Sequence, residues 1–352
     1  MLKILLLPFA IIYGTITGIR NKLFDWGIIK SKSFNIPIIS IGNINMGGTG
    51  KSPHIEYLVR LLQSNNNVAT LSRGYKRKTK GFKLVKQQAT ALEVGDEPAQ
   101  FKHKFRNITV AVDEKRVHGV KKLQELDPYL NVVLLDDAFQ HRYIKPGLSI
   151  LLTDFHNTYN NDYLFPSGTL RESRSGAKRA DIIIITKMPK VLSPITKRRL
   201  YNEIKPKEHQ ELFTTYLKYG KLNHVFKKSP VTKAKKFSTI IMVSGIANPY
   251  PLEEHLRRKC NELITLSYKD HHNFSKKDIL NIKKIFDNTF TKNKAIITTE
   301  KDAMRIMSAE GNELIKELPL YYISVEIGFH KEQKQKFDRI IKKYVRKNSE
   351  NK

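Results

Sequence analysis

The sequence predicts an α/β protein: a mostly parallel sheet flanked by helices, followed along the chain by a second, smaller α/β unit. Short apolar runs alternate with amphipathic helical segments through most of the 352 residues. Strands that alternate with helices form right-handed crossovers on a parallel sheet. Residues 182–185 are four consecutive isoleucines, which suits a central strand buried on both faces. The length allows about two domains of ~150 residues each.

The first half of the chain carries the parallel sheet. We expect its strands at 36–41, 68–72, 108–112, 132–136, 148–153 and 182–186. Between the first two strands, Ile55, Leu58, Val59 and Leu62 recur at positions i, i+3, i+4 and i+7. This spacing places them on one helix face and predicts a helix over 53–63 that packs against the sheet.

The second half resumes the alternation after a lysine-rich polar stretch at 218–236, which predicts a hairpin or linker. Beyond it we expect strands at 238–243, 262–267, 295–299 and 320–324, and helices at 251–259, 276–286 and 331–346. The expected organisation is an apolar N-terminal helix at 1–30, a core at 31–220, a hairpin or linker at 221–236, a smaller α/β domain at 237–330, and a basic helix and tail at 331–352.

The composition narrows the classes of protein and of partner. A hydrophobic content of 40% excludes a disordered chain, and the single cysteine, Cys260, excludes a disulfide framework or a thiolate metal cluster. The net charge of +30 favours anionic partners: nucleic acid, acidic lipid surfaces or phosphorylated small molecules. Solvated basic helix faces explain the same charge without any partner, so charge alone selects none of these.

The N-terminus holds an apolar run over residues 4–19, preceded by Lys3 and followed by Arg20 and Lys22. As a helix these 16 residues reach about 24 Å, short of the ~30 Å hydrocarbon core of a bilayer. A helix lying in the membrane interface with basic flanks fits this pattern best. A first helix packed into the core and a signal peptide are the alternatives, although no small-x-small cleavage site follows the run.

The sharpest local signal is a glycine-rich loop between the first strand and the first helix. It consists of Gly47, Gly48, Thr49, Gly50, Lys51 and Ser52. Backbone N–H groups of such a loop surround phosphate oxygens, the lysine reaches the β- and γ-phosphates, and the hydroxyl ligates Mg²⁺. The usual P-loop spacing places its first glycine where this chain has Asn45. The strand–loop–helix context predicts a P-loop NTPase-like core.

Two carboxylates, Asp136 and Asp137, follow the strand expected at 132–136. P-loop enzymes place an acidic residue at such a strand end to hold magnesium. Open α/β sheets also bind their ligands at the carboxyl ends of strands. We therefore predict a metal site formed by Ser52, Asp136 and Asp137.

Three further stretches are rich in functional residue types. Arg73 follows a strand and is suited to pairing with a phosphate. Asp96 and Glu97 stand at an expected helix start, where N-capping is the simpler alternative. His271 and His272 precede a helix, and without further ligands nearby an acid–base role is more plausible than zinc binding. A solvent-exposed turn histidine is the other alternative.

These stretches together resemble the tetraacyldisaccharide 4′-kinase (lipid A 4′-kinase) family. The resemblance extends in order from residue 40 to about 305. It rests on these motifs: Gly42-Asn43 with Gly47-Gly48-Thr49-Gly50-Lys51-Ser52-Pro53, Leu71-Ser72-Arg73-Gly74-Tyr75, Gly95-Asp96-Glu97-Pro98, Asp113 with Arg116, Asp136-Asp137 with Gln140-His141, Pro166-Ser167-Gly168-Thr169-Leu170-Arg171-Glu172, Gly245-Ile246-Ala247-Asn248-Pro249, Asp270-His271-His272 and Thr299-Glu300-Lys301-Asp302-Ala303. The loop alone is weak evidence for this family, but the ordered set is specific.

The resemblance implies an ATP- and Mg²⁺-dependent transfer of phosphate to the 4′-hydroxyl of a tetraacylated glucosamine disaccharide 1-phosphate in lipid A biosynthesis. It implies a peripheral or monotopic enzyme on the cytoplasmic face of the inner membrane, whose partners are the acylated disaccharide lipid and the membrane surface. Asp96 would then accept the hydroxyl proton with His271 polarising or relaying it. Glu97, Arg116 and Gln140 would support this site.

Two other functions fit part of the sequence. A P-loop ATPase or GTPase acting on nucleic acid agrees with the basic charge, but no stacking platform or recognition helix is evident. A membrane-surface module that binds nucleotide as a switch agrees with the N-terminal helix. We expect no nucleic acid partner and infer no protein partner.

Overall fold

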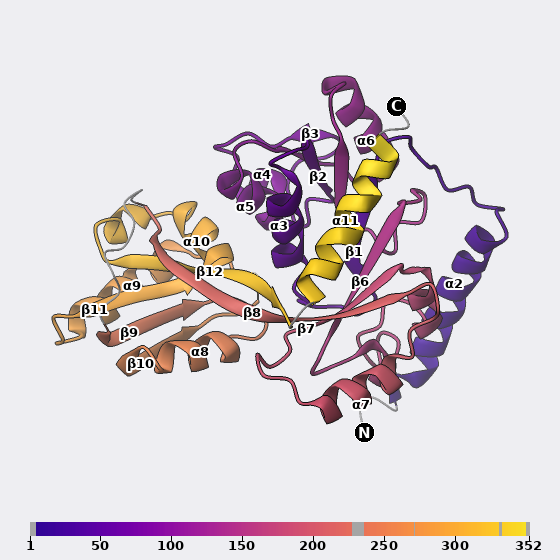
Figure 1. The fold of residues 1–352 in the computed structure, drawn as a ribbon. Coiled ribbons are helices and arrows are strands. Elements are labelled where there is room, and N and C mark those ends of the chain that lie inside the picture. Colours follow the sequence, from indigo (N-terminus) through magenta and orange to yellow (C-terminus); the bar gives the residue numbers. More distant parts are fainter. Residues whose placement is uncertain (1–4, 227–235, 271, 331–332, 350–352) are drawn as a thin grey trace.

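A single sheet of twelve strands forms the frame of the described chain, in the order β10-β9-β11-β12-β8-β7-β6-β1-β5-β2-β4-β3. The computed structural model describes residues 5–226, 236–270, 272–330 and 333–349. Figure 1 shows the core half of the sheet and, extending to one side of it, the second half in orange. The α/β architecture predicted from the sequence is confirmed.

The core half contains a run of parallel strands from β8 through β4, with the short β3 antiparallel at the edge. Its strands are β1 (Ile38–Asn43), β2 (Val68–Ser72), β3 (Lys83–Leu84), β4 (Thr109–Val112), β5 (Val132–Asp136), β6 (Leu148–Asp154) and β7 (Ile182–Thr186). The strands expected at 68–72, 132–136 and 182–186 are confirmed with the same bounds, and the other three lie within two residues of their predicted ends.

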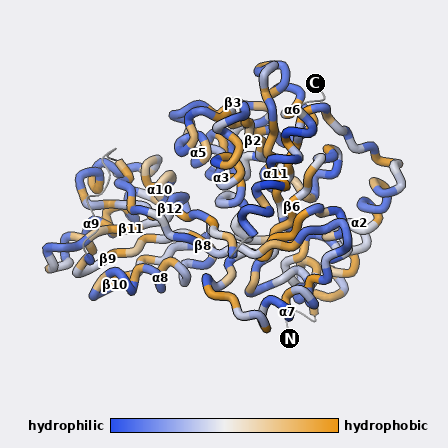
Figure 2. The backbone as a smooth tube through the Cα atoms, in the orientation of Figure 1, coloured by the Kyte–Doolittle hydropathy of each residue, from blue (hydrophilic) through white to orange (hydrophobic). Residues whose placement is uncertain are grey.

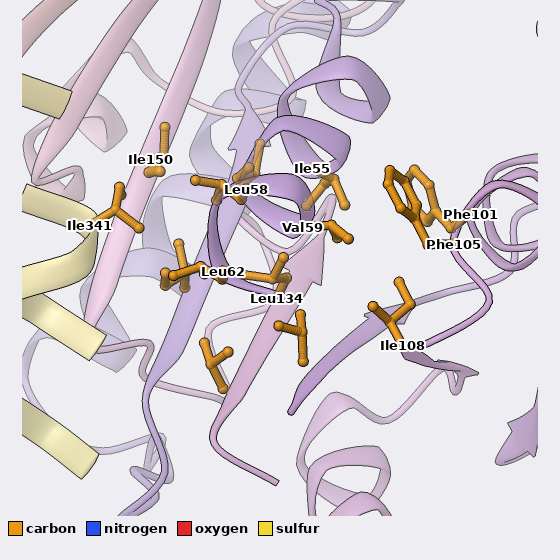
Figure 3. Close-up of a cluster of buried hydrophobic side chains, with 14 of the residues drawn as sticks. Ile55, Leu58, Val59, Leu62, Phe101, Phe105, Ile108, Leu134, Ile150 and Ile341 are labelled. Atoms are coloured by element: carbon orange, nitrogen blue, oxygen red, sulfur yellow. The ribbon is translucent and has the colours of Figure 1, made fainter. Parts of the chain in front are cut away.

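Helices cover both faces of this half: α3 (Lys51–Leu62), α4 (Ala91–Val94), α5 (Asp96–Lys104), α6 (Arg116–Leu126) and α7 (Pro194–Ile204). Alternate β1 residues face opposite sides, so Ile39 and Ile41 pack with α3 whereas Ile38 packs on the α6 side. Figure 3 shows the buried face of α3 between strand residues and Phe101 and Phe105 of the α5 region. Figure 2 shows the hydrophobic colouring of central strands such as β6 beside the largely hydrophilic α11. This packing fixes the start of α3 at the carboxyl edge of the sheet.

The long strand β8 (Glu211–His224) joins the two halves. Its first residues pair in parallel with β7, and its remainder pairs antiparallel with β12 (Leu320–Phe329). The expectation of a hairpin or linker from 218 onward is therefore wrong for 218–224, and 227–235 lie outside the described residues. The composition of this stretch is polar because Lys218 and Lys221 lie on the solvent-facing side of the strand. Leu222 of the same strand is buried.

The second half adds the parallel strands β9 (Phe237–Ser244), β10 (Cys260–Ser267) and β11 (Lys294–Thr299), with α8 (Tyr250–Arg257), α9 (Lys276–Asn288) and α10 (Glu300–Met307). The last helix, α11 (Gln333–Ser349), returns to the core, where Phe337, Ile341 and Val345 share a cluster with α3. Because one sheet runs through both halves, the division into domains stays a prediction.

The N-terminal helix α2 (Leu7–Asp25) buries little of its apolar surface. Of its residues only Ala10 and Phe24 are buried, while Phe9, Ile11, Ile12, Ile16 and Ile19 are each more than half exposed. The alternative of a core-packed first helix is therefore wrong. No helix among the described residues is long and apolar enough to cross a membrane. Figure 1 shows α2 on the side of the core away from the second half.

Candidate active site

The loop between β1 and α3 has the backbone of a phosphate cradle. Gly47 and Gly50 have φ of +108° and +88°, a region that favours glycine. A Cβ at Gly47 or Gly48 would meet no described residue within 4 Å, and both glycines are exposed to solvent. Below it, the neutral ring of His54 donates from Nδ1 to the Gly50 carbonyl at 2.7 Å. Burial lowers the pKa of His54 to about 4, so this support stays uncharged.

The departure from the usual P-loop spacing has a structural reason. Asn45 has no left-handed backbone, and its side-chain amide donates to Asp162 at 2.9 Å. Asn45 also forms a bridge with Leu170. The position therefore anchors the loop to the segment around Leu170, and a glycine there would lose that anchor.

Lys51 faces the second of the paired aspartates. Its Nζ donates to Asn43 Oδ1 at 3.1 Å and lies 3.5 Å from Asp137 Oδ1. Arg171 Nη1 lies 3.1 Å from both oxygens of Asp137. Burial opposes ionisation of Asp137, but Lys51 and Arg171 outweigh it and hold the pKa of that carboxyl below its usual value. Two cations thus meet one carboxylate at the position expected for the terminal phosphates of a nucleotide.

Asp136 is the more deeply buried of the pair, with 5% of its surface exposed. Burial, then the charges of Glu97 and Asp137, raise its pKa to about 7. Its Oδ1 has no hydrogen-bond partner among the described residues. This carboxylate oxygen of Asp136 and the hydroxyl oxygen of Ser52, at the start of α3, are oxygen ligands of the kind that Mg²⁺ prefers. These residues therefore fit the predicted magnesium ion.

Asp96 and Glu97 open α5 and pair with cations of α10, from the second half of the chain. Arg305 forms a salt bridge with Asp96, and Lys301 Nζ lies 2.6 Å from Glu97 Oε1. Burial opposes ionisation of Glu97, yet Lys301 keeps the pKa of Glu97 below its usual value. The N-cap of α5 is Gly95, so the capping alternative does not explain these carboxylates. After burial, the negative charge of Glu97 is the next cause of the raised pKa of Asp136, so the acidic pair lies close enough to influence the predicted metal site.

The remaining predicted residues are placed as follows. Arg116 is buried and donates to the carbonyl of Asp136 at 3.4 Å. Arg73 is exposed directly after β2. Burial lowers the pKa of Arg116, and the positive charge of Arg73 lowers it further. The amide of Gln140 donates to the Asn43 carbonyl at 2.8 Å and to Glu172 Oε1 at 3.0 Å, so it braces the end of β1.

His271 lies outside the described residues. The residues around it are close to α10, because a Cβ on Gly245 would approach the side chains of His272 and Asp302 at 3.2 Å. His272 itself is hydrogen-bonded to Asp278 at 3.0 Å and stacks on Tyr268. Its ring therefore has partners of its own in the second half of the chain.

Four site residues have no assigned role in the sequence prediction: Asn43, Arg171, Lys301 and Arg305. Asn43, Arg171 and Lys301 stand inside motifs that carry the family resemblance, so the resemblance could have pointed to these three residues. The pairing of Arg305 with Asp96 spans 209 positions and leaves no mark in local spacing.

A glycine-rich loop whose lysine faces paired aspartates at the end of the next parallel strand defines a P-loop nucleotide-binding protein. Residues 2–346 match the family described as Tetraacyldisaccharide-1-P 4'-kinase, and the chain belongs to that family.

Relatives and a solved structure agree with this. The chain is 45% identical over 362 residues to Tetraacyldisaccharide 4'-kinase of Bacteroides thetaiotaomicron, covering 98% of this chain and 94% of the relative. It is 43% identical over 351 residues to the protein of that name from Flavobacterium johnsoniae, covering 99% of each. A crystal structure of LpxK from Aquifex aeolicus in complex with ATP superposes with a TM-score of 0.74 at 28% identity, covering 98% of this chain and 100% of that one.

Proposed function

We propose that this protein transfers the γ-phosphate of ATP to the 4′-hydroxyl of a tetraacylated glucosamine disaccharide 1-phosphate in lipid A biosynthesis. The observation that carries the proposal is the cluster of Lys51, Asp137 and Arg171. It lies beside Asp136, whose Oδ1 has no hydrogen-bond partner in the part of the chain that the structure describes. Membership of the kinase family supports the choice of acceptor.

The glycine-rich loop and Lys51 bind the phosphates of ATP in this proposal. Lys51 exchanges its contact with Asp137 for the β- and γ-phosphates, and Arg171 remains on Asp137 beside the transferred group. Ser52 and Asp136 would hold Mg²⁺, which supplies neutralisation of the phosphate charge when bound. Asp137 and Arg116 position these groups from the end of β5 and from α6.

Asp96 accepts the proton of the 4′-hydroxyl in the proposed reaction. The hydroxyl oxygen forms a bond to the γ-phosphorus, the bond from that phosphorus to the β-phosphate bridging oxygen breaks, and ADP leaves. Arg305 holds the Asp96 carboxylate in one orientation at the start of α5. We infer that His271 assists Asp96 as a relay, and that Arg73, Glu97 and Gln140 support the site.

The exposed apolar surface of α2 supports binding at the membrane, where an acylated acceptor resides. Phe9, Ile12 and Ile16 face solvent, with Arg20 and Lys22 at the following turn. A helix with apolar and basic surfaces lies in the bilayer interface and does not cross it. We propose a peripheral or monotopic enzyme on the cytoplasmic face of the inner membrane.

Incubation with ³²P-labelled ATP and the disaccharide 1-phosphate in neutral detergent tests the function. The expected product is a bisphosphorylated lipid. ATP hydrolysis stimulated by nucleic acid without a lipid product would favour the nucleic-acid ATPase. Nucleotide binding without any transfer would favour the membrane-surface switch.

A further inference from the structure

A buried ionic cluster joins three helices whose ends carry residues of the candidate site. Lys104 Nζ lies 2.6 Å from Glu56 Oε2 and 2.9 Å from Glu300 Oε1. The side chains of Glu56 and Glu300 are 1% and 11% exposed, and that of Lys104 is 17% exposed. One ammonium group therefore neutralises two carboxylates that are largely removed from water, and the reaction proposed above uses none of the three.

An amide and a second cation complete the cluster. Gln100 Nε2 donates to Glu56 Oε1 at 2.8 Å and to Glu300 Oε2 at 3.3 Å. Arg60 Nη2 lies 3.4 Å from Glu56 on the more exposed side of that carboxylate. Because Gln100 is uncharged, Lys104 is the cation that the two carboxylates share.

The three helices of the cluster also carry the proposed reaction. Glu56 lies on α3, about 7.5 Å along the helix axis from Lys51 of the ATP cradle. Lys104 ends α5, whose first residue is Asp96. Glu300 begins α10, whose cations pair with the carboxylates at the start of α5. A shift of one helix at the cluster would therefore move a residue of the site.

The pairs between α5 and α10 run in opposite order along the two helices. Asp96, at the start of α5, pairs with Arg305 near the end of α10. Lys104, at the end of α5, pairs with Glu300 at the start of α10. The two helices are thus tied at both ends, and the contact between Lys104 and Glu56 attaches them to α3.

The charge of Lys104 is what allows Glu56 and Glu300 to lie together. Burial, and then the charge of Glu300, raise the pKa of Glu56 above its usual value, whereas Lys104 acts in the opposite direction. Removal of one partner from a buried ion pair leaves an uncompensated charge. Without Lys104 the two carboxylates would repel each other, and this repulsion would separate α10 from α3.

We propose that Lys104 is a positioning residue for phosphoryl transfer: by joining Glu56 to Glu300, it sets the distance between the ATP cradle on α3 and the base Asp96 on α5. This inference rests on the proposed function. Phosphoryl transfer requires the attacking oxygen to lie in line with the γ-phosphate, and a misplacement of about 1 Å costs up to about 10²-fold in rate. The loop and the start of α3 bind ATP on their own, so the cluster governs the rate and not ATP affinity.

The test removes the shared charge and then the repulsion that its loss creates. Lys104→Met deletes the ammonium group and keeps a flexible apolar stem. The double variant Lys104→Met, Glu56→Gln also removes one of the two repelling carboxylates. Lys283→Met is the matched control, because the Lys283 ammonium group lies 2.6 Å from a carboxylate, Asp287, on an exposed surface of the second half. Thermal melting verifies that each variant is folded.

We expect Lys104→Met to lower kcat for the lipid acceptor by about 10- to 100-fold at about pH 8, with KM for MgATP within about threefold of the wild type. The double variant should recover kcat to within about threefold of the wild type, because a neutral amide at position 56 does not repel Glu300. The control should match the wild type.

Three results would overturn the proposal. The first is normal kcat in Lys104→Met, and the second is a rise in KM for MgATP as large as the fall in kcat. The third is a double variant no faster than Lys104→Met, because a lysine that merely stabilises the fold gives losses that no second substitution at Glu56 relieves.

Failure of the proposed function has a different signature, because the wild type would then form no bisphosphorylated lipid. Amide hydrogen exchange still tests the bridge in that case. Faster exchange in α5 and α10 of Lys104→Met, reversed in the double variant, supports the role of Lys104 in joining the helices. Exchange equal to that of the wild type in both helices contradicts it.

Discussion

The exposed surface of α2 allows a quantitative prediction for membrane binding. Ile12 and Ile16 are 58% and 63% exposed, and full burial of such a side chain contributes about 1.5–3 kcal/mol. Burying the exposed part of both therefore contributes about 2–4 kcal/mol. Replacing both by serine should weaken binding to anionic vesicles by about 30- to 700-fold, at ~1.4 kcal/mol per factor of ten.

Vesicle sedimentation measures this directly. Leu280→Ser with Phe290→Ser is the control, because both residues are exposed in the second half of the chain, away from α2. The melting temperature of the Ile12→Ser, Ile16→Ser variant should stay near that of the wild type, since neither residue packs in the core. Vesicle affinity within twofold of the wild type would refute the assignment of α2 to the membrane surface.

Two further predictions concern the candidate active site. Arg171 pairs with Asp137, and in the proposed reaction it lies beside the transferred phosphate. Arg171→Ala should therefore lower kcat by about 10²–10³ with a small change in KM for ATP, and Arg171→Lys should restore part of the rate. Equal effects on kcat and on ATP affinity would argue against this role. Asp136 has a pKa of about 7, so its carboxyl is mostly protonated below pH 7 and mostly ionised above it. Because Mg²⁺ needs the ionised form, KM for MgATP should rise about tenfold from pH 8 to pH 6; a flat profile over this range would contradict the metal assignment.

Much of the fold follows from period and hydrophobicity alone. The isoleucine run of β7 and the i, i+3, i+4, i+7 face of α3 each specify one element, and both were predicted. The end of β8 was not, because a strand with one solvent-facing side and two exposed lysines has the composition of a linker. Its pairing with β12, about 100 positions later, decides its structure.

One part of the candidate site is set by local sequence, and another part depends on residues far apart in the chain. The glycine-rich loop is local, so its backbone conformation could be predicted from residues 47–52. The pairing of α5 with α10 is not local: Lys301 and Arg305 pair with Glu97 and Asp96 across 204 and 209 positions of the sequence. Sequence spacing could identify the two carboxylates but not the cations that hold them.

The proposed reaction depends on Asp96 as the base that takes the proton of the 4′-hydroxyl, and kcat of an Asp96→Asn variant measures that role. We expect kcat for the lipid acceptor to fall by about 10² or more while Kd for MgATP stays near the wild-type value. Asp287→Asn, at an exposed residue that also pairs with a cation, serves as the control and should keep full activity. Normal turnover by Asp96→Asn would show that Asp96 is not the base.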